Sequence, residues 1–513
     1  MPLKTLEKGM SLLRHEYPDW LLLRRGDVWQ EGLGGWFNYD RGGRSATEPM
    51  VIGAYGDGER PLLKVGRQKF FRVVTGRNMP VDWPGVGNLA IVGLHIYDHI
   101  GDPDSPDFDK SEEKGGEGLS WHSTGANLLI EDCYFDYTGL AVIGHGPRIK
   151  EVEEKLTNFQ LRRCVVANNW SSSGHCQGMF LNDVHGALIE ECVFDHNGYS
   201  LEMGDLPTWY NHNIYISTRC DGIVARGNII ARGSSTGIYC RTNGVLENNL
   251  CLDNTPSLNL GRIRKARPGG VTGRVAGNVV INATPRTNEK RTIRGCGIEV
   301  GNINKQGAVV ANNILIDAGE SPGALAIHPE GVGVHNTVFR NNIVYNWVAG
   351  FHVIGQPSKG HISGNVFAVN LLQNPDRGEK GLIHVRDMVE PRGVEFRDNV
   401  YWSAAEVSEW FRVGAGDRET VGVAFKEWSR RALDSSSRVG RVEFADPTRT
   451  AATYNATLGG EATREAFLAE ACQQSKSNWR PEYKAAAVIA YIRERFRPRG
   501  DVGGAGAAPA RGD

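Results

Sequence analysis

A short pattern of alternating apolar and polar residues recurs along most of this chain, and it constrains the fold more than any other feature. Each copy carries a cysteine or an asparagine at one fixed position, and successive anchor residues are separated by 21 to 36 residues. The anchors are Cys133, Cys164, Cys192, Asn228, Asn249, Asn278, Asn313, Asn342, Asn365 and Asn399. Such alternation is typical of a half-buried strand, and its recurrence indicates a repeat architecture.

A second short strand precedes each copy, and a longer variable loop follows it. Examples of the second strand are GLAVI (139–143), NIYIS (213–217) and GIYCR (237–241). Units of this kind bury their inward side chains only when they stack on one another. Equivalent residues then form ladders spaced about 4.8 Å apart. The sequence therefore predicts an all-β solenoid, a parallel β-helix of about 10–11 coils with the anchors in an internal ladder.

The chain divides into four predicted regions. Residues 1–49 form an N-terminal cap with a lead-in segment, and LEKGMSLLR supplies the cap helix. Residues 50–403 form the β-helix, residues 404–498 a helical C-terminal capping region, and residues 499–513 a disordered tail. The helical segments TREAFLAEACQQS and RPEYKAAAVIAYIRERF are expected to cover the last coils, because open sheet edges promote aggregation.

Charge and composition narrow the possible partners. The chain has 513 residues with 58 basic and 59 acidic side chains, so its net charge of −1 gives no field that favours nucleic acid or anionic lipid. No segment has the ~20 consecutive apolar residues of a membrane span. The first residues lack the features of a signal peptide, so the protein is cytosolic or its leader is not part of this chain. The nine cysteines fit no zinc motif and are expected to be buried free thiols.

Several segments carry a resemblance to a known group. The N-terminal LLLRRGDVW and GGRSATEPMVIGAYGDGERP, and the central GHCQGMFLNDVHGALIEECVFDHNGY and YNHNIYIS, resemble right-handed parallel β-helix proteins of the pectin-lyase-like superfamily. They are most similar to a secreted bacterial subgroup without firmly assigned chemistry. The resemblance implies a right-handed coil, a secreted location (extracellular or periplasmic), and a polysaccharide substrate for a lyase, hydrolase or epimerase. Fold analogy alone does not fix function.

One further match is local. Gly144-His145-Gly146 and Arg148-Ile149-Lys150 resemble two motifs of the polygalacturonase hydrolases. In that family a full coil separates the two motifs, whereas here they are almost contiguous. The aspartate motifs of the family have no counterpart at matching positions. The match therefore assigns no residue to catalysis.

The outward positions of the second strands change in character in the middle of the chain. Alternation places the second and fourth residues of each strand outward. The outward set of the second position is Ser120, Ala141, Phe180, Tyr215, Tyr239, Asn259, Glu299, Leu325 and His352. The predicted substrate-binding residues in and beside the strands are Asn182, Asp183, Asn211, Tyr239, Asn259, Arg262 and Glu299. Such a stripe suits a sugar chain, because arginine forks bind carboxylates. The alternative is an ordinary solvated sheet face.

Elimination from a uronate is the chemistry that these residues favour. A cation neutralises the carboxylate, a base removes the α-proton, and an acid assists the leaving oxygen. The predicted catalytic residues are Tyr215 and His212 as base and acid and Arg241 as the cation, with Arg262 as an alternative cation. Tyr215 and Arg241 are predicted to lie on adjacent coils about 5 Å apart.

Two other functions remain open. A glycoside hydrolase needs two carboxylates about 5–5.5 or 6.5–9.5 Å apart. Asp183 and Glu299 are predicted to be about 19 Å apart at the β-strand spacing, so a hydrolase would need Asp205 as the partner of Asp183. The second alternative is a non-catalytic carbohydrate-binding or structural β-helix, for which a uniform outer face would be expected.

No cofactor is predicted, and no metal ligand is assigned. The loop GDPDSPDFDK contains four aspartates, and calcium is the ion that it could bind, although its spacing matches no known calcium loop. His122, His175 and His185 lack a zinc-ligand spacing. The predicted partner is a polysaccharide, without nucleic acid, and the predicted state is a monomer.

Overall fold

The structure is a computed structural model of the whole chain. It describes residues 3–497 apart from gaps at 35–39, 67–68, 75–84, 112–116, 146–154, 172–173, 263–266, 284, 289–290, 294, 318–322, 355–361, 377–380, 386–390 and 417–418. The predicted tail, residues 499–513, lies outside the described residues. The chain forms two compact units, and each is described by itself. Unit 1 contains residues 1–238 and 469–484, and unit 2 contains residues 239–468 and 485–513.

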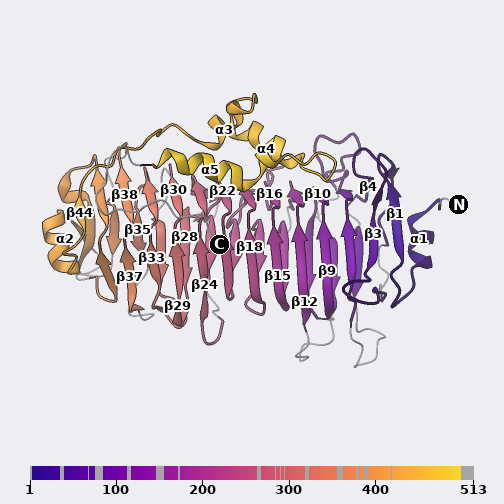
Figure 1. Cartoon of the computed structure of the whole chain (residues 1–513), viewed down its shortest axis with the longest axis horizontal. Coiled ribbons are helices and arrows are strands. Elements are labelled where there is room, and N and C mark those ends of the chain that lie inside the picture. The colour runs from indigo at the N-terminus through magenta and orange to yellow at the C-terminus, as the bar shows by residue number, and fades with distance from the viewer. Residues whose placement is uncertain are drawn as a thin grey trace. The chain divides into compact units, whose positions relative to one another are not determined.

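Unit 1 is built from three parallel sheets whose strands alternate along the chain (Figure 1). Sheet A contains β1 (Trp20–Arg24), β3 (Met50–Tyr55), β6 (Leu89–Val92), β9 (Gly125–Glu131), β12 (Leu156–Arg162), β15 (Val184–Glu190) and β18 (Asp221–Arg226). Sheet B contains β2 (Val28–Trp29), β4 (Leu62–Lys64), β7 (His95–Tyr97), β10 (Tyr134–Asp136), β13 (Val165–Ala167), β16 (Val193–Asp195) and β19 (Ile229–Ala231). Sheet C contains β5 (Phe71–Val74), β8 (Glu117–His122), β11 (Gly139–Ile143), β14 (Met179–Asn182) and β17 (Ile214–Ile216).

Unit 2 repeats this arrangement, and the boundary between the units falls within β20 (Ile238–Cys240). Its sheet A contains β21 (Gly244–Glu247), β24 (Val271–Ala276), β29 (Ile303–Ala311), β33 (Val338–Arg340), β37 (Asn365–Ala368) and β40 (Val394–Arg397), with β32 (Val334–His335) and β36 (Ile362–Ser363) beside it. Its sheet B contains β22 (Leu250–Leu252), β25 (Val279–Ile281), β30 (Ile314–Ile316), β34 (Ile343–Tyr345), β38 (Leu371–Asn374), β41 (Val400–Ser403) and β44 (Arg438–Val439). Its sheet C contains β23 (Leu258–Leu260), β28 (Cys296–Gly301), β31 (Gly323–His328), β35 (Phe351–Val353), β39 (Ile383–Val385), β42 (Phe411–Gly416) and β43 (Glu419–Val423).

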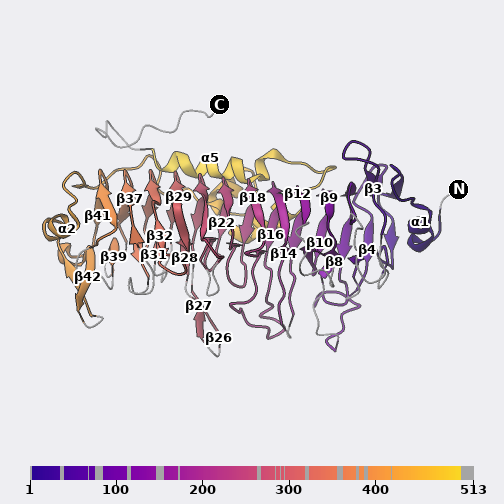
Figure 2. The same cartoon turned by 90° about the horizontal axis from the view of Figure 1, so that it is seen from below.

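Each turn of the chain thus adds one strand to each of three sheets, which is the architecture of a right-handed parallel β-helix. The predicted fold class is confirmed. The parallel pairing extends beyond the predicted range 50–403. Before residue 50, β1 pairs with β3 in unit 1, and after residue 403, β44 pairs with β41 in unit 2. Two pairs are antiparallel. Strand β43 pairs with β42, and β26 (Arg286–Asn288) and β27 (Arg291–Ile293) form a separate hairpin that projects from the coils (Figure 2).

The helices cap or cover the coils. Helix α1 (Leu6–Leu12) is the predicted N-terminal cap, and the side chain of Thr5 accepts a hydrogen bond from its first turn. Helix α2 (Phe425–Ala432) covers the last coil of unit 2, where Trp428 stacks on Phe411 at 4.9 Å. The other helical elements are η2 (Val407–Glu409), α3 (Ala451–Thr457), α4 (Arg464–Cys472), η3 (Pro481–Tyr483) and α5 (Ala485–Arg495).

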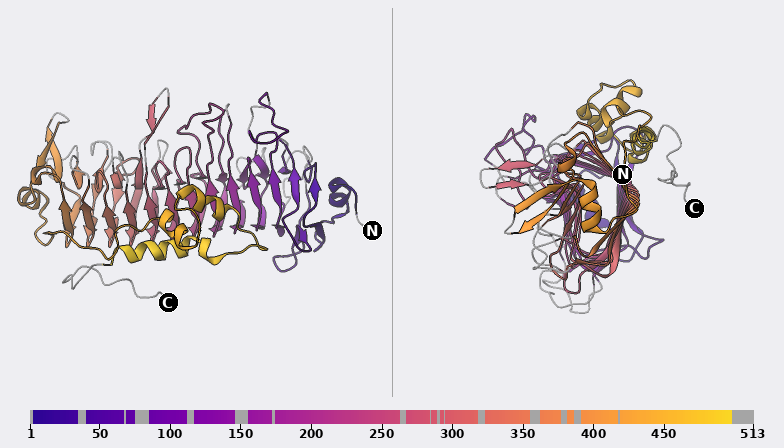
Figure 3. Two further views of the ribbon diagram at one scale, coloured as in Figure 1. Left: turned by 90° about the horizontal axis from the view of Figure 1, so that it is seen from above. Right: turned by 90° about the vertical axis from the view of Figure 1, so that its left-hand side faces the viewer.

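The last helices do not cover the last coils, so that expectation was wrong. Helix α5 packs beside β22 (Figure 1), which belongs to the first complete coil of unit 2, and the yellow C-terminal helix runs along the side of the coils in Figure 3. Arg493 on α5 donates hydrogen bonds to the carbonyl oxygens of Gly277 and Asn312. Helix α5 therefore buries an apolar face, and Arg493 binds the bends of the coils from the side, whereas the buried residues of α2 provide the end cap.

The internal ladder differs in composition between the two units. In unit 1 the backbone N–H groups of Cys133 and Cys164 each donate to the sulfur of the next ladder cysteine at 3.4 Å. In unit 2 the ladder consists of Asn249, Asn278, Asn313, Asn342, Asn370 and Asn399, joined by amide hydrogen bonds of 2.9–3.2 Å. The assignment of Asn365 to this ladder was wrong, because the strand register pairs Ile343 with Leu371 and so places Asn370 after Asn342. All nine cysteines are free thiols; eight of them are buried as expected, and Cys472 is partly exposed.

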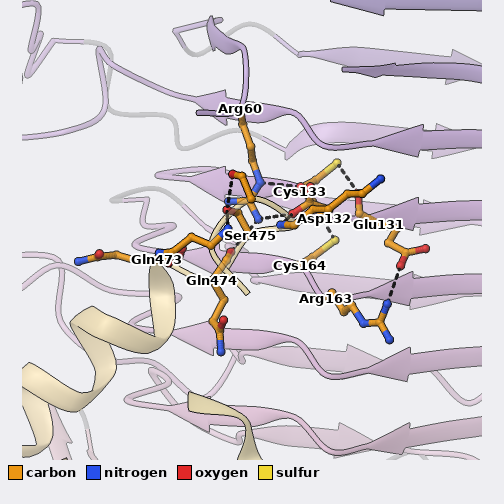
Figure 4. Close-up of polar contacts among 12 residues, drawn as sticks. Arg60, Glu131, Asp132, Cys133, Arg163, Cys164, Gln473, Gln474 and Ser475 are labelled. Carbon is orange, nitrogen blue, oxygen red and sulfur yellow. Dashed lines mark hydrogen bonds and ion pairs between the residues drawn. The ribbon is translucent and has the colours of Figure 1, made fainter. Parts of the chain in front are cut away.

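Residues 469–484, here called the C-terminal strap, belong to unit 1 although they follow helices of unit 2 in the sequence. Figure 4 shows how the strap is held: Arg60 donates to the carboxylate of Asp132 and to the carbonyl oxygen of Gln474, at 2.7 Å each. Asp132 also accepts a hydrogen bond from the backbone of Lys476 at 2.8 Å. One buried carboxylate therefore joins the strap to an early coil.

Candidate functional site

The outer face of sheet C in unit 1 carries a ladder of side chains in register. Parallel pairing aligns Arg72 with Ser120, Ser120 with Ala141, Ala141 with Phe180, and Phe180 with Tyr215. Ser120 and Ala141 are buried, whereas Phe180 and Tyr215 are partly exposed. Within unit 1 this ladder thus changes from the small residues Ser120 and Ala141 to the aromatic residues Phe180 and Tyr215.

His212 and Tyr215 lie together at one edge of this ladder. Their rings meet edge to face with centroids 5.3 Å apart, and Tyr215 also contacts Phe180 at 5.1 Å. His212 is buried, and its Nδ1 accepts a hydrogen bond from the backbone of Thr236 at 3.3 Å. This bond places the ring proton on Nε2, so the neutral imidazole of His212 has a proton that it can donate.

The two asparagines that flank His212 hold the loops before β17. Asn211 accepts from the backbone of Cys176 and donates to the carbonyl oxygen of Gly198, both at 2.8 Å. Asn213 accepts from Asn197 and donates to the carbonyl oxygen of Ala231. Both amides are buried. The asparagines around His212 thus fix its backbone, and a contact of Asn211 with substrate stays a prediction.

A second cluster lies where β14 ends, around the buried side chain of Asp183. Asn182 donates to one carboxylate oxygen at 2.6 Å, and His145 Nδ1 lies 2.8 Å from the same oxygen. Arg219 Nε donates to the other oxygen at 2.7 Å. The three partners come from β14 itself, from the end of β11 and from the turn after β17, because consecutive coils bring those turns into line.

The contacts around Asp183 set its ionisation. Burial alone raises the pKa of this carboxyl, but the hydrogen bonds from His145 and Arg219 outweigh burial and hold its pKa below the ordinary value. Asp183 is therefore an anion that orients the imidazole and the guanidinium. Of the GHGPRIK segment, Gly144 and His145 are described, and residues 146–150 lie outside the described residues.

Asp205 lies elsewhere in unit 1, in the loop that leads into β17. Its backbone forms an isolated antiparallel β-bridge with Ser200, and its carboxylate accepts a hydrogen bond from the backbone N–H of Ser171 at 3.3 Å. Burial raises the pKa of Asp205 to about 6. The loop of Asp205 precedes the first residue of β17, which pairs with Met179 at the start of β14. Asp183 follows the end of β14, four positions after Met179, which corresponds to a strand length of about 13 Å. The loop of Asp205 and the carboxylate of Asp183 are thus attached to opposite ends of the sheet C strands.

The remaining predicted residues lie in unit 2. The guanidinium of Arg241 lies 5.8 Å from the centre of the Tyr239 ring. Glu299 is fully buried and accepts hydrogen bonds from Asn259 at 3.2 Å and from Arg262 at 3.3 Å. His328 Nε2 lies 3.1 Å from its other carboxylate oxygen. Glu299 is thus a buried anchor, and the partly exposed Arg262 is the member of this cluster that faces solvent.

The register of unit 2 corrects one outward position. Asn259 pairs with Glu299, Glu299 with Ala326, Ala326 with His352, and His352 with His384. The placement of Leu325 on the outer face was therefore wrong. The outward residue Ala326 is the third after its glycine, Gly323, whereas Glu299 is the second after Gly297. Sequence reasoning also missed His384, whose ring stacks on His352 at 4.5 Å.

The structure brings the predicted residues into groups within each unit. In unit 1 they are His212 with Tyr215, and Asn182 with Asp183; in unit 2 they are Tyr239 with Arg241, and Asn259 and Arg262 with Glu299. Tyr215 belongs to unit 1 and Arg241 to unit 2, so their predicted proximity stays a prediction. The residues that sequence reasoning left unassigned are His145, Arg219 and His328. Polar residues at the turns of successive coils were the signal for the first two.

The acidic loop after β7 is held by its own contacts. Tyr97 donates to Asp102 at 2.5 Å, Lys64 lies 2.9 Å from Asp107, and Asp109 accepts from Ser111. Within the described ranges, no group of three or more histidine, cysteine, aspartate or glutamate side chains is arranged to hold a metal ion. Calcium binding by this loop stays a prediction. Of the helices in the described part of the chain, none has the length and hydropathy of a membrane span.

No protein-family model and no curated protein matches the chain. Among solved structures it is similar to a GH87 α-1,3-glucanase from Streptomyces thermodiastaticus, with 11% identity and a TM-score of 0.39 over 83% of this chain and 64% of that one. It is similar to a GH136 lacto-N-biosidase from Eubacterium ramulus, with 12% identity and a TM-score of 0.36 over 86% and 65%. It is also similar to a PL6 family alginate lyase, with 12% identity and a TM-score of 0.37 over 86% and 59%. The match spans less than two thirds of each of these proteins.

Proposed function

We propose that the protein is a secreted carbohydrate-active enzyme, a lyase that cleaves a uronate-containing polysaccharide by β-elimination. The observation that carries the proposal is the contact between His212 and Tyr215 on the outer face of sheet C. Elimination needs one group that removes a proton and one that donates a proton to the leaving oxygen. A tyrosine and a histidine with rings 5.3 Å apart supply both groups without a pair of carboxylates.

In this proposal Tyr215 is the base and His212 is the acid. The hydrogen bond from Thr236 to Nδ1 leaves the proton of His212 on Nε2, which is the form that an acid requires. Arg241 neutralises the uronate carboxylate, which acidifies the neighbouring C–H group. Asn182, Asp183, Asn211, Tyr239, Asn259, Arg262 and Glu299 are proposed to position the sugar chain, directly or through their neighbours. The protein is proposed to act as a monomer and without an organic cofactor.

The test is a product assay on a panel of uronate and neutral polysaccharides, with and without calcium. A lyase forms a new C=C bond, so ultraviolet absorbance and reducing ends rise together. Tyr215→Phe should lower the rate by about 10²–10⁴-fold, the usual contribution of a positioned proton-transfer group. Tyr55→Phe is the matched control, because Tyr55 is an exposed tyrosine at the end of β3 in the same unit. Full activity of a folded Tyr215→Phe protein would refute the assigned base.

A glycoside hydrolase is the second candidate, and the raised pKa of Asp205, about 6, favours it. A general acid must hold its proton near neutral pH, whereas the partner carboxylate must be ionised. Asp205 and Asp183 have these opposite tendencies, but they are attached to opposite ends of the sheet C strands, so the geometry places this candidate second. Reducing ends without ultraviolet absorbance, together with loss of activity in Asp205→Asn, would select this candidate. Silence in both assays across the panel would favour a non-catalytic carbohydrate-binding protein.

A further inference from the structure

Arg219 is anchored to Asp183 in a way that leaves most of its binding capacity unused. The contact is made by Nε alone, at 2.7 Å from Asp183 Oδ1. The Arg219 side chain is 51% exposed, whereas that of Asp183 is 2% exposed. The two terminal nitrogens have no partner among the residues that the structure describes. An arginine held in this way presents a pre-oriented fork to solvent.

Other arginines of unit 1 use their forks differently. Arg232 binds Asp195 through both Nε and Nη2, and Arg226 binds Glu190 through the same two atoms. The Arg232 fork is filled by both oxygens of Asp195, and the two nitrogens of Arg226 share one oxygen of Glu190. Arg219 differs from them because its carboxylate partner occupies only the inner nitrogen.

The backbone of Arg219 is also held in place. Its N–H donates to Ser217 Oγ at 3.2 Å, and Ser217 is hydrogen-bonded to Asn182. Asn182 in turn donates to Asp183, which closes a ring of contacts between β14 and the turn after β17. Because the guanidinium is fixed at its inner end, little side-chain entropy remains to be lost when a ligand binds.

The local charge around Arg219 suits an anion. The ammonium group of Lys155 donates a hydrogen bond to the backbone carbonyl oxygen of Arg219 at 2.8 Å. Lys155 and Arg219 together outweigh the single negative charge of Asp183, and His145 adds a further hydrogen-bonding group on the far side of that carboxylate. The site also lies close to the proposed reaction centre, because Arg219 follows Tyr215 by four residues, a strand length of at most about 13 Å.

We propose that Arg219, supported by Asp183 and Lys155, is a specificity subsite that binds the carboxylate of an acidic sugar next to the one that reacts at Tyr215. The terminal nitrogens of Arg219 match the two oxygens of a uronate carboxylate, and a neutral sugar offers no such partner. This inference rests on the proposed function for its substrate class, but it concerns binding and does not depend on which bond is cleaved.

Binding therefore tests the subsite separately from catalysis. The full chain carrying Tyr215→Phe is titrated calorimetrically with trimers of galacturonate, mannuronate and guluronate, and with the corresponding carboxyl-reduced trimers. The expected result is binding of at least one uronate trimer and much weaker binding of its neutral counterpart. Adding Arg219→Gln should weaken uronate binding by about 10–100-fold, the value of a charge-assisted hydrogen-bond pair.

Two further variants keep the test decisive. Arg219→Lys retains the charge and the fold but loses the planar fork, so it should recover only part of the affinity. Arg226→Gln removes an equally exposed arginine of the same unit that binds Glu190 and should leave affinity unchanged. Equal affinity of Arg219→Gln and its parent, equal binding of neutral and acidic trimers, or no binding of any uronate trimer would each overturn the subsite. Uronate binding that depends on Arg219 in a wild-type protein without lyase activity would refute the proposed reaction and leave the subsite in place.

Discussion

Asp132 and Arg60 form an ion pair of 2.7 Å in which the two side chains are 6% and 8% exposed. Arg25 lies 3.3 Å from the other oxygen of the same carboxylate. Asp132 also accepts a hydrogen bond from the backbone of Lys476 in the C-terminal strap. One carboxylate thus neutralises two buried guanidinium groups and connects segments that are up to 344 residues apart in the sequence.

Replacing this carboxylate should be costly. Asp132→Asn keeps the size of the side chain and suits the positive φ of 56° at this residue, so it changes little besides the charge. Because two buried arginines lose their counter-charge, we expect unit 1 to lose about 3–5 kcal/mol of unfolding free energy in urea denaturation. Glu48→Ala, which removes an exposed i,i+4 pair with Arg44, should cost less than about 0.5 kcal/mol. Equal losses in the two variants would contradict the role of Asp132.

The internal ladders predict that alanine substitutions at equivalent positions, an asparagine in unit 2 and a cysteine in unit 1, lower the free energy of unfolding by different amounts. Asn313 is fully buried and accepts from both the backbone and the amide of Asn278, and it donates to the carbonyl oxygen of Val275. Asn313→Ala strands several buried polar groups and should cost about 3 kcal/mol or more. Cys164→Ala removes a small thiol whose sulfur accepts a weak hydrogen bond from the backbone N–H of Cys133 and donates weakly to backbone carbonyl oxygens, and it should cost about 1–2 kcal/mol. Thermal unfolding of both variants measures the difference, and a cysteine variant that is the less stable of the two would refute the explanation.

The repeat made most of the fold predictable from the sequence. The alternating pattern gave the strands, and their stacking gave parallel sheets. The assignment failed at Asn365, where the letters GNV imitate the anchor of other coils although the true ladder residue, Asn370, lies five positions later. The pattern of a single coil cannot reveal this, because Asn365 begins β37 just after β36, which pairs with β32, whereas Asn370 follows β37 and continues the ladder.

The candidate site was predictable only where its residues are close in the sequence. His212 and Tyr215 are three residues apart, so alternation and spacing indicated that they lie together. His145, Asp183 and Arg219 come from turns on three successive coils, and Arg219 is 36 residues from Asp183. Loop lengths vary between coils, so only the three-dimensional register shows that these side chains meet. The structure was also needed to show that Glu299 is buried and holds Arg262, which is the partly exposed residue of the pair.

The raised pKa of Asp205 predicts a dependence of stability on pH. Its folded-state pKa of about 6 exceeds the ordinary aspartate value of 3.8, so the folded protein binds this proton more tightly than the unfolded chain does. The protonated form is therefore favourable at low pH, and its contribution is lost as the pH rises through about 4 to 6. Asp205→Asn should raise the melting temperature at pH 8 and have little effect at pH 4. A constant difference between variant and wild type across this range would exclude a buried, titrating Asp205.

The bend before each ladder residue offers a stabilising substitution. Asn312, Asn341 and Asp398 occupy this bend in unit 2 with φ of 57°, 53° and 56°. Val369 occupies the same bend with φ 56°, although a β-branched residue is strained in the left-handed region by about 1–2 kcal/mol.

Val369→Asn should therefore raise the unfolding free energy by about 1 kcal/mol, since asparagine tolerates this conformation and the valine side chain is only partly buried. Val366→Asn is the control, because Val366 lies in β37 with ordinary strand geometry and should be destabilised by the same change. Thermal unfolding separates the two outcomes. Stabilisation at position 369 with destabilisation at position 366 would show that the gain comes from the backbone conformation at the bend. Destabilisation of both variants would mean that packing of Val369 outweighs the strain.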